Sequence, residues 1–327
     1  MKYYPVTSVH HGVVNVGDLP IPFDVVLNSS ALVVLITFVY LKISWKESLI
    51  THREEFFNDK GNLIGKLFGF LLLFLLIAPG IVSNESAKTS ISPLLLWVFL
   101  WIGVPVLGLL FGDVYAKFNP LNLFSINSNK PKSVYLACIL FVGLTWFELV
   151  WRKPGNPFNI GVVFILLFIS VNSSRYFLKK SLIEVDPLLL LHYLYSKLQL
   201  FNSRPYFRSL LDNIGNLARL KGIEYFVLLM IGTVTYDGLR ETTFWYEQFG
   251  SRINDMGFST MMFIFMNLTT ILFYRFACFF AIKTGGSDLE LNKVSNLFGH
   301  TMLPIAFAYH VTHYLTLLLF ELSLIHI

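Results

Sequence analysis

Apolar runs of about twenty residues alternate with shorter polar segments along the whole 327-residue chain. A helix that crosses the hydrocarbon core of a bilayer needs about 20 consecutive, mostly apolar residues. By this rule we expect eight spanning helices, at residues 24–43, 65–83, 93–112, 133–151, 159–177, 221–239, 257–279 and 300–322. The pattern therefore predicts an all-α fold, a polytopic transmembrane helical bundle that forms a single domain over residues 1–327.

One further apolar stretch, at about residues 186–201, contains too few apolar residues to cross a membrane. Asp186 is a suitable N-cap, and Pro187 suits the first position of a helix. Basic residues flank this stretch at Lys179, Lys180, Arg204 and Arg208. We therefore expect an in-plane amphipathic helix on the cytoplasmic side, with His192 as an interfacial side chain rather than a ligand.

Composition agrees with the membrane class, since the chain is 55% hydrophobic and 14% charged, with a mean hydropathy of +0.62. The net charge of +5 does not indicate a nucleic-acid partner, because the basic residues gather in particular loops. Nineteen of the 25 Lys and Arg residues fall in the loops 42–66, 113–132, 175–221 and 275–299. Because basic loops stay in the cytoplasm, we expect a cell-membrane protein with both termini extracytoplasmic.

Several ionisable residues fall inside the predicted spans, where they are costly and therefore candidates for function. Glu148 lies near the outer end of the fourth span, and Asp237 at the outer end of the sixth. His310 and His313 occupy the middle and outer half of the eighth span, and His11 precedes the first span on the same side. We expect these groups to meet in the extracytoplasmic half of the bundle.

The histidine pair predicts a metal site. At about 100° per residue, His310, His313 and Tyr314 share one face of the helix. Two imidazoles three residues apart can bind one divalent ion, with zinc or copper as the expected metal, and Glu148, Asp237 or His11 could complete the shell. Alternatively, the histidines form hydrogen bonds across the bundle, and each acid caps a helix or pairs with a nearby arginine.

Other kinds of site find no support in the sequence. Cys138 and Cys278 both fall inside apolar runs, which is typical of small buried hydrophobic residues. The chain has no zincin, P-loop or nucleophile-elbow spacing, so we expect no nucleotide. Haem ligation by two histidines needs facing helices with histidines at similar depth, and only the last span offers deep ones, so we expect no haem.

Five stretches, in order along the chain, resemble bacterial polytopic membrane proteins known as fenitrothion hydrolase-like. They are HGVVNVGDLPIPF, GDVYAKFNPLNLF, VDPLLLLHYLYSKLQLF, GTVTYDGLRETTFW and LPIAFAYHVTHYLTLLLFE. The resemblance implies that the motifs at His11-Gly12, Tyr236-Asp237-Gly238 and His310/His313/Tyr314 flank one site in a bacterial inner-membrane protein. It also leaves room for a membrane partner subunit beside the lipid bilayer. Relatives often begin with a signal peptide and continue past the last motif, so we expect this chain to be truncated at both ends.

Two functions remain open. The first is an outward-facing, metal-dependent hydrolase of an apolar ester, which the resemblance suggests is similar to an organophosphorus triester. His310, His313 and His11 would bind the metal, Glu148 and Asp237 would be catalytic, and the substrate pocket would be lined by Trp146, Tyr236, Tyr309 and Tyr314. The alternative is a transporter or channel for a metal ion, proton or small solute, which Asp113 and His300 favour because they extend polarity towards the inner face.

Overall fold

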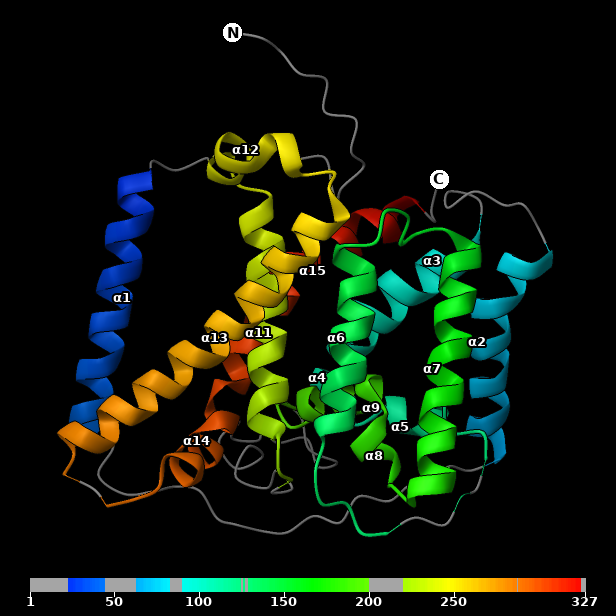
Figure 1. Cartoon of the computed structure of the whole chain (residues 1–327), viewed down its shortest axis with the longest axis horizontal. Helices are drawn as coiled ribbons and strands as arrows, with labels where there is room; N and C mark the ends of the chain where they lie inside the picture. Colours follow the sequence, from blue (N-terminus) through cyan, green and yellow to red (C-terminus); the bar gives the residue numbers. More distant parts are fainter. Residues whose placement is uncertain are drawn as a thin grey trace, which may run out of the picture.

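The computed structural model describes residues 23–44, 63–82, 90–124, 126, 129–199, 220–286 and 288–324, and every regular element in these ranges is a helix (Figure 1). The elements are α1 (Phe23–Ser44), α2 (Leu63–Val82), α3 (Ile91–Pro93), η1 (Leu94–Gly103), α4 (Val104–Phe111), α5 (Tyr115–Phe118), α6 (Tyr135–Leu149), α7 (Pro157–Leu178), α8 (Leu182–Val185), α9 (Pro187–Ser196), α11 (Ile223–Arg240), α12 (Thr243–Phe249), η2 (Gly250–Arg252), α13 (Met256–Thr284), α14 (Leu291–Gly299), η3 (His300–Met302) and α15 (Leu303–Leu324). The all-α prediction is confirmed.

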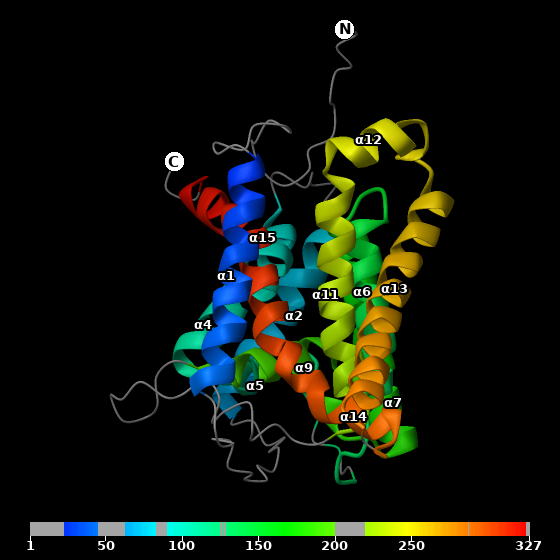
Figure 2. The ribbon, with the colours of Figure 1, turned by 90° about the vertical axis from the view of Figure 1, so that its left-hand side faces the viewer.

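Within the described residues, four helical segments are long and apolar enough to cross a membrane: Leu63–Val82, Ile91–Phe111, Pro157–Leu178 and Met256–Thr284. A helical segment also occupies each of the other four predicted ranges, as α1, α6, α11 and α15. Helices α1, α2, α6, α7 and α11 lie roughly along one direction, whereas α13 runs obliquely to them (Figure 1). Helix α12 lies at one end of the bundle and α14 at the other (Figures 1 and 2). The protein is therefore an all-α membrane protein.

Many apolar side chains on these helices face outward, which is compatible with contact with a lipid bilayer. Every described side chain of α1 is exposed, including the large apolar Phe38. Exposed phenylalanines also lie along α13, at Phe273 and Phe276. Cys138 and Cys278 are free and buried, which confirms the prediction that they pack as small hydrophobic residues.

Glycines allow two pairs of helices to approach closely. A Cβ at Gly80 of α2 would lie 2.5 Å from the carbonyl oxygen of Pro157, at the start of α7. A Cβ at Gly232 of α11 would lie 3.1 Å from Cα of Asn267 in α13. Small residues at helix contacts are the usual means by which membrane helices bring their backbones together.

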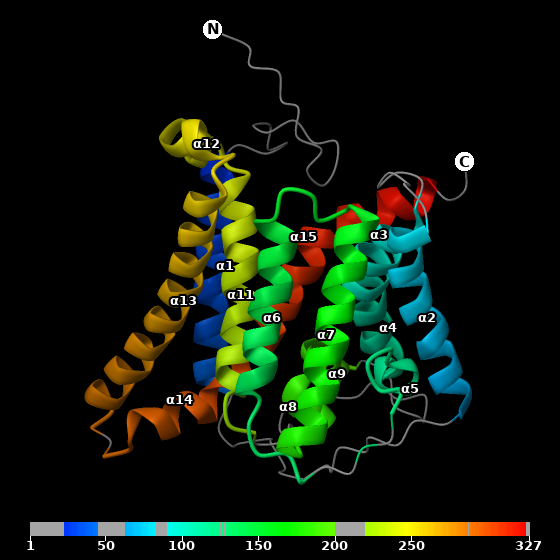
Figure 3. The same cartoon turned by 45° about the vertical axis from the view of Figure 1, so that its right-hand side comes forward.

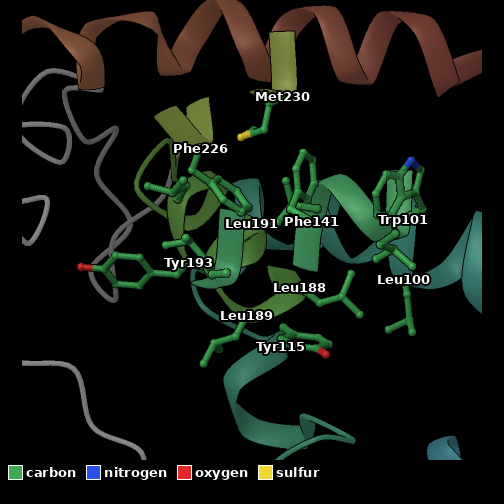
Figure 4. Packing of buried hydrophobic residues seen from close by; sticks show 14 of the residues in the cluster. Leu100, Trp101, Tyr115, Phe141, Leu188, Leu189, Leu191, Tyr193, Phe226 and Met230 are labelled. Atoms are coloured by element: carbon green, nitrogen blue, oxygen red, sulfur yellow. The ribbon is translucent and has the colours of Figure 1, made fainter. Parts of the chain in front are cut away.

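Helix α9 lies in the interior of the bundle. All ten of its residues are buried, and Figure 4 shows Leu188, Leu189, Leu191 and Tyr193 packed among side chains of η1, α5, α6 and α11. The predicted in-plane amphipathic helix is therefore not confirmed. Four consecutive leucines, Leu188–Leu191, place apolar side chains all around the helix, so no polar face is left for the membrane surface.

Helix α15 brings the late histidines to the centre of the fold. It packs against α11, η1 and α9, and in Figure 3 it passes behind α6. Helix α6 in turn packs against α11. The end of α6 that carries Glu148 and the end of α11 that carries Asp237 point the same way, towards α12 (Figure 1). This arrangement positions the candidate site.

Candidate functional site

A histidine and an aspartate from two packed helices form the centre of the site. Nε2 of His313, on α15, lies 2.7 Å from Oδ2 of Asp237, on α11. Asp237 is 1% exposed, whereas the His313 side chain is 22% exposed. The carboxyl group is thus held inside the protein, while the imidazole extends from it towards a more open region.

The direction of this hydrogen bond decides what the imidazole can do. An ionised carboxylate only accepts hydrogen bonds, so in that state Nε2–H of His313 is the donor and Nδ1 of the neutral ring carries a lone pair. Among the described residues, Nδ1 makes no hydrogen bond. A ring held by a carboxylate at one nitrogen and open at the other is the usual arrangement of a general base.

A second acid lies close to this pair. Glu148, on α6, is buried, and its carboxyl group lies beside the side chain of Tyr314. Its carboxyl group lies within electrostatic reach of Asp237, Tyr314 and Arg240. Arg240 donates a hydrogen bond from Nη1 to the carbonyl of Leu149, which ties the end of α11 to the end of α6. The acids predicted from separate spans therefore do converge.

His310 lies one helical turn before His313 on α15. It is buried, and it forms its hydrogen bond with the backbone rather than with an acid. Its Nε2 lies 2.9 Å from the backbone carbonyl oxygen of Trp101 in η1, so this nitrogen is the donor. Trp101 lies in η1, a π-helix that passes into α4, and Pro105, four residues further on, has no N–H to donate to its carbonyl. The proline thus leaves an acceptor that His310 can use from the neighbouring helix.

These contacts bear on the predicted metal site. Among the described residues, no group of three or more His, Cys, Asp or Glu side chains is arranged to hold a metal ion. Nε2 of His310 contacts the carbonyl of Trp101 and Nε2 of His313 contacts Asp237, so these two nitrogens have different partners. His11 lies outside the described residues. Within the part of the chain that the structure describes, the side chains predicted as ligands do not assemble a zinc or copper centre.

The four aromatic residues expected to line a pocket divide into two groups. Tyr314 is buried, and its ring centroid lies 5.0 Å from those of both His310 and His313. The hydroxyl of Tyr309 lies 3.2 Å from where a Cβ on Gly238 would stand, which places it beside the residue after Asp237. These two tyrosines adjoin the site.

Trp146 and Tyr236 belong to a separate aromatic cluster. Tyr236 packs with its ring centroid 6.1 Å from that of Trp245 and 5.5 Å from that of Phe263. Trp146 borders the same cluster and donates a 3.0 Å hydrogen bond to Thr260. Neither residue contacts the histidines in this arrangement, because neighbouring positions on a helix face different sides.

Sequence reasoning missed the polar groups of α9 and α5 that lie next to the site. His192 is 3% exposed, not interfacial, and its ring centroid lies 4.4 Å from that of Tyr115. Tyr195 contacts His310 with a centroid separation of 5.7 Å. A histidine directly after four leucines was the available signal, since a run so apolar is typical of a buried helix.

Comparison with known proteins identified no relative of this chain. No protein-family model matches the chain, and neither a curated protein nor a solved structure matches it. Function is therefore inferred from the geometry around His313 and Asp237.

Proposed function

We propose that this protein is a membrane-embedded hydrolase in which His313 and Asp237 activate water for attack on an apolar ester. The observation that supports this proposal is the 2.7 Å contact between a buried carboxylate and an imidazole whose second nitrogen is open. General acid–base catalysis by such a group accelerates a reaction by about 10²–10⁴-fold.

The proposed step conserves every atom and proton. Nδ1 of His313 takes a proton from water while the water oxygen bonds to the electrophilic phosphorus or carbon of the ester. Asp237 stabilises the imidazolium that forms, as a buried carboxylate does for a catalytic histidine. The bond to the leaving oxygen then breaks, and that oxygen takes up a proton from the imidazolium. Glu148 and the Tyr314 hydroxyl supply polar groups beside the reacting atoms.

The substrate class follows from the surroundings of the pair and from the resemblance to fenitrothion hydrolase-like proteins. Tyr309 and Tyr314 place apolar ring surface beside the pair, and the outer faces of the helices are apolar. An uncharged organophosphorus triester dissolves in a bilayer and could reach such a site laterally. We therefore assign an apolar ester of this kind as the substrate.

We also propose how the bundle sits in the membrane. Helical segments lie in all eight predicted ranges, and the strong bias of Lys and Arg to one set of loops supports a topology with the α12 end outside the cytoplasm. The His/acid site then faces outward in a bacterial inner membrane. A zinc or copper ion would need a further ligand beside His313 and Asp237, and we propose His11, which lies outside the described residues, for that role.

Hydrolysis of a p-nitrophenyl phosphotriester by purified protein in lipid nanodiscs tests the proposal. We expect nitrophenolate release above that of empty nanodiscs, and no such release would overturn the hydrolase. Elemental analysis and treatment with a chelator form a separate arm that tests the metal. In proteoliposomes, movement of a solute through protein that cleaves no ester would favour the alternative, a transporter or channel for a metal ion, proton or small solute.

A further inference from the structure

Three buried side chains in the centre of the bundle carry polar atoms that lack hydrogen-bond partners among the described residues. They are the hydroxyls of Tyr115 and Tyr195 and both ring nitrogens of His192. Tyr115 and Tyr195 are fully buried, and His192 is nearly so. They come from α5 and α9, which the hydrolase proposal does not use.

Leaving such atoms dry would be costly. Moving an amide or hydroxyl into an apolar interior without a partner costs roughly 1–3 kcal/mol in proteins, and most buried polar atoms are therefore paired with protein or ordered water. Four unpaired atoms in one part of the core indicate that water occupies this region. Buried waters typically bind to two to four such groups.

The polar groups continue from α9 towards the His/acid site. The ring centroid of Tyr195 lies 5.7 Å from that of His310, and His192 lies within electrostatic reach of the same histidine. His310 is 5.0 Å from Tyr314 between ring centroids, and Tyr314 is 5.0 Å from His313. His313 then contacts Asp237. These neighbours form a continuous series of polar side chains from α9 to the His/acid site.

The groups also continue in the other direction. The Tyr115 ring lies 4.4 Å from the His192 ring, and its hydroxyl lies within electrostatic reach of Asp186 and, more weakly, of Asp113, in the segment that follows α4. Asp113 is partly exposed, and Lys117 and Lys197 lie near it. Burial raises the pKa of the Asp113 carboxyl, although a backbone hydrogen bond from Ala116 and the two lysines oppose this.

We propose that a hydrated proton pathway joins the His313/Asp237 site to the C-terminal end of α4. The pathway is lined by Asp113, Tyr115, His192 and His310. A neutral imidazole can accept a proton at one nitrogen and release one from the other, so His192, whose two ring nitrogens both lack partners among the described residues, would pass a proton between neighbouring waters. His310, whose Nε2 donates to the carbonyl of Trp101, would take up and release the proton at Nδ1. One proton enters as one leaves, and no co-reactant is needed. This activity goes beyond ester hydrolysis and does not depend on it.

Proton flux through the purified protein in liposomes tests the pathway without any ester present. A potassium gradient with valinomycin sets the driving voltage, and an enclosed dye reports internal pH. We expect the wild-type protein to carry protons faster than protein-free liposomes do, and His192→Phe to abolish this excess. Tyr193→Phe, on the same helix but with its ring beneath Lys197, is the matched control and should conduct as the wild type does.

Two milder variants keep the test decisive if His192→Phe fails to fold. Tyr115→Phe and Tyr195→Phe each remove one hydroxyl and leave the ring packing intact, and each should reduce the flux. Wild-type flux no greater than that of protein-free liposomes would overturn the proposal. So would wild-type flux in both tyrosine variants. Failure of the hydrolase would appear as absent ester cleavage with proton flux intact, so the two proposals fail separately.

Discussion

Asp237 holds the imidazole of His313 at 2.7 Å, although the two residues lie 76 positions apart in the sequence. Packing of α11 against α15 brings them together, and burial of the carboxyl makes its interaction with the ring stronger than it would be in water. The open side of the ring faces away from this contact. The functional predictions follow from this pair.

Asp237→Asn should reduce the turnover number for ester hydrolysis by about 10²–10⁴-fold, because the amide cannot stabilise the imidazolium that forms on His313. Steady-state kinetics with the p-nitrophenyl phosphotriester measures this change. Asp255→Asn is the matched control, since Asp255 caps the start of α13 and lies outside the site. Equal losses in both variants would contradict the assigned role.

His310→Phe should destabilise the protein by about 1–3 kcal/mol, because the carbonyl of Trp101 loses its partner inside the bundle. His310→Gln retains an N–H donor and should recover part of that loss. Denaturant or thermal unfolding in detergent measures both variants. If His310→Phe unfolds at the wild-type midpoint, the contact with Trp101 does not stabilise the fold.

Gly80→Ala should destabilise the protein by about 1–3 kcal/mol, because the added methyl group would lie 2.5 Å from the backbone of Pro157. Gly143→Ala, in α6, meets nothing within 4 Å and should leave stability unchanged or raise it by about 0.5–1 kcal/mol. Unfolding of both variants under one condition provides the comparison. A loss at Gly143 as large as that at Gly80 would exclude close packing as the cause.

The predictable part of the fold was the part that depends on apolar runs. Every predicted span coincides with a helix, since about twenty apolar residues suffice to specify one. Helix α9 was misplaced because a membrane surface and a protein core both accept leucine, and a single sequence does not distinguish them. Its burial becomes evident only when α4, α6 and α15 are seen to pack against it.

The same limit applies to the site. The depth of Glu148, Asp237 and His313 along their helices could be estimated from the sequence, and these residues do lie together. The rotation of α6 and α11 about their axes could not be estimated, because apolar side chains surround most of each helix and do not show which side faces the protein interior. Trp146 and Tyr236 therefore turned out to belong to another cluster.

The stability contribution of Asp186 should depend on pH. Burial raises the pKa of its carboxyl from 3.8 to about 6, although hydrogen bonds from Leu189 and Asn119 oppose the shift. A raised folded pKa means that this stabilisation is fully present below pH 3.8 and is lost as pH rises through about 6. The melting temperature of the wild type relative to Asp186→Asn should therefore be higher at pH 5 than at pH 7.5. A difference that does not change with pH would contradict the shift.

Ester hydrolysis by His313→Ala, measured beside His300→Ala in the same nanodiscs, tests the central claim most directly. His300 lies in η3, at the start of α15 and away from the site, so this control removes an imidazole without touching the Asp237 contact. We expect His300→Ala to retain wild-type turnover and His313→Ala to lose it by about 10²-fold or more. Wild-type turnover in His313→Ala would show that the His313–Asp237 pair does not carry out the chemistry.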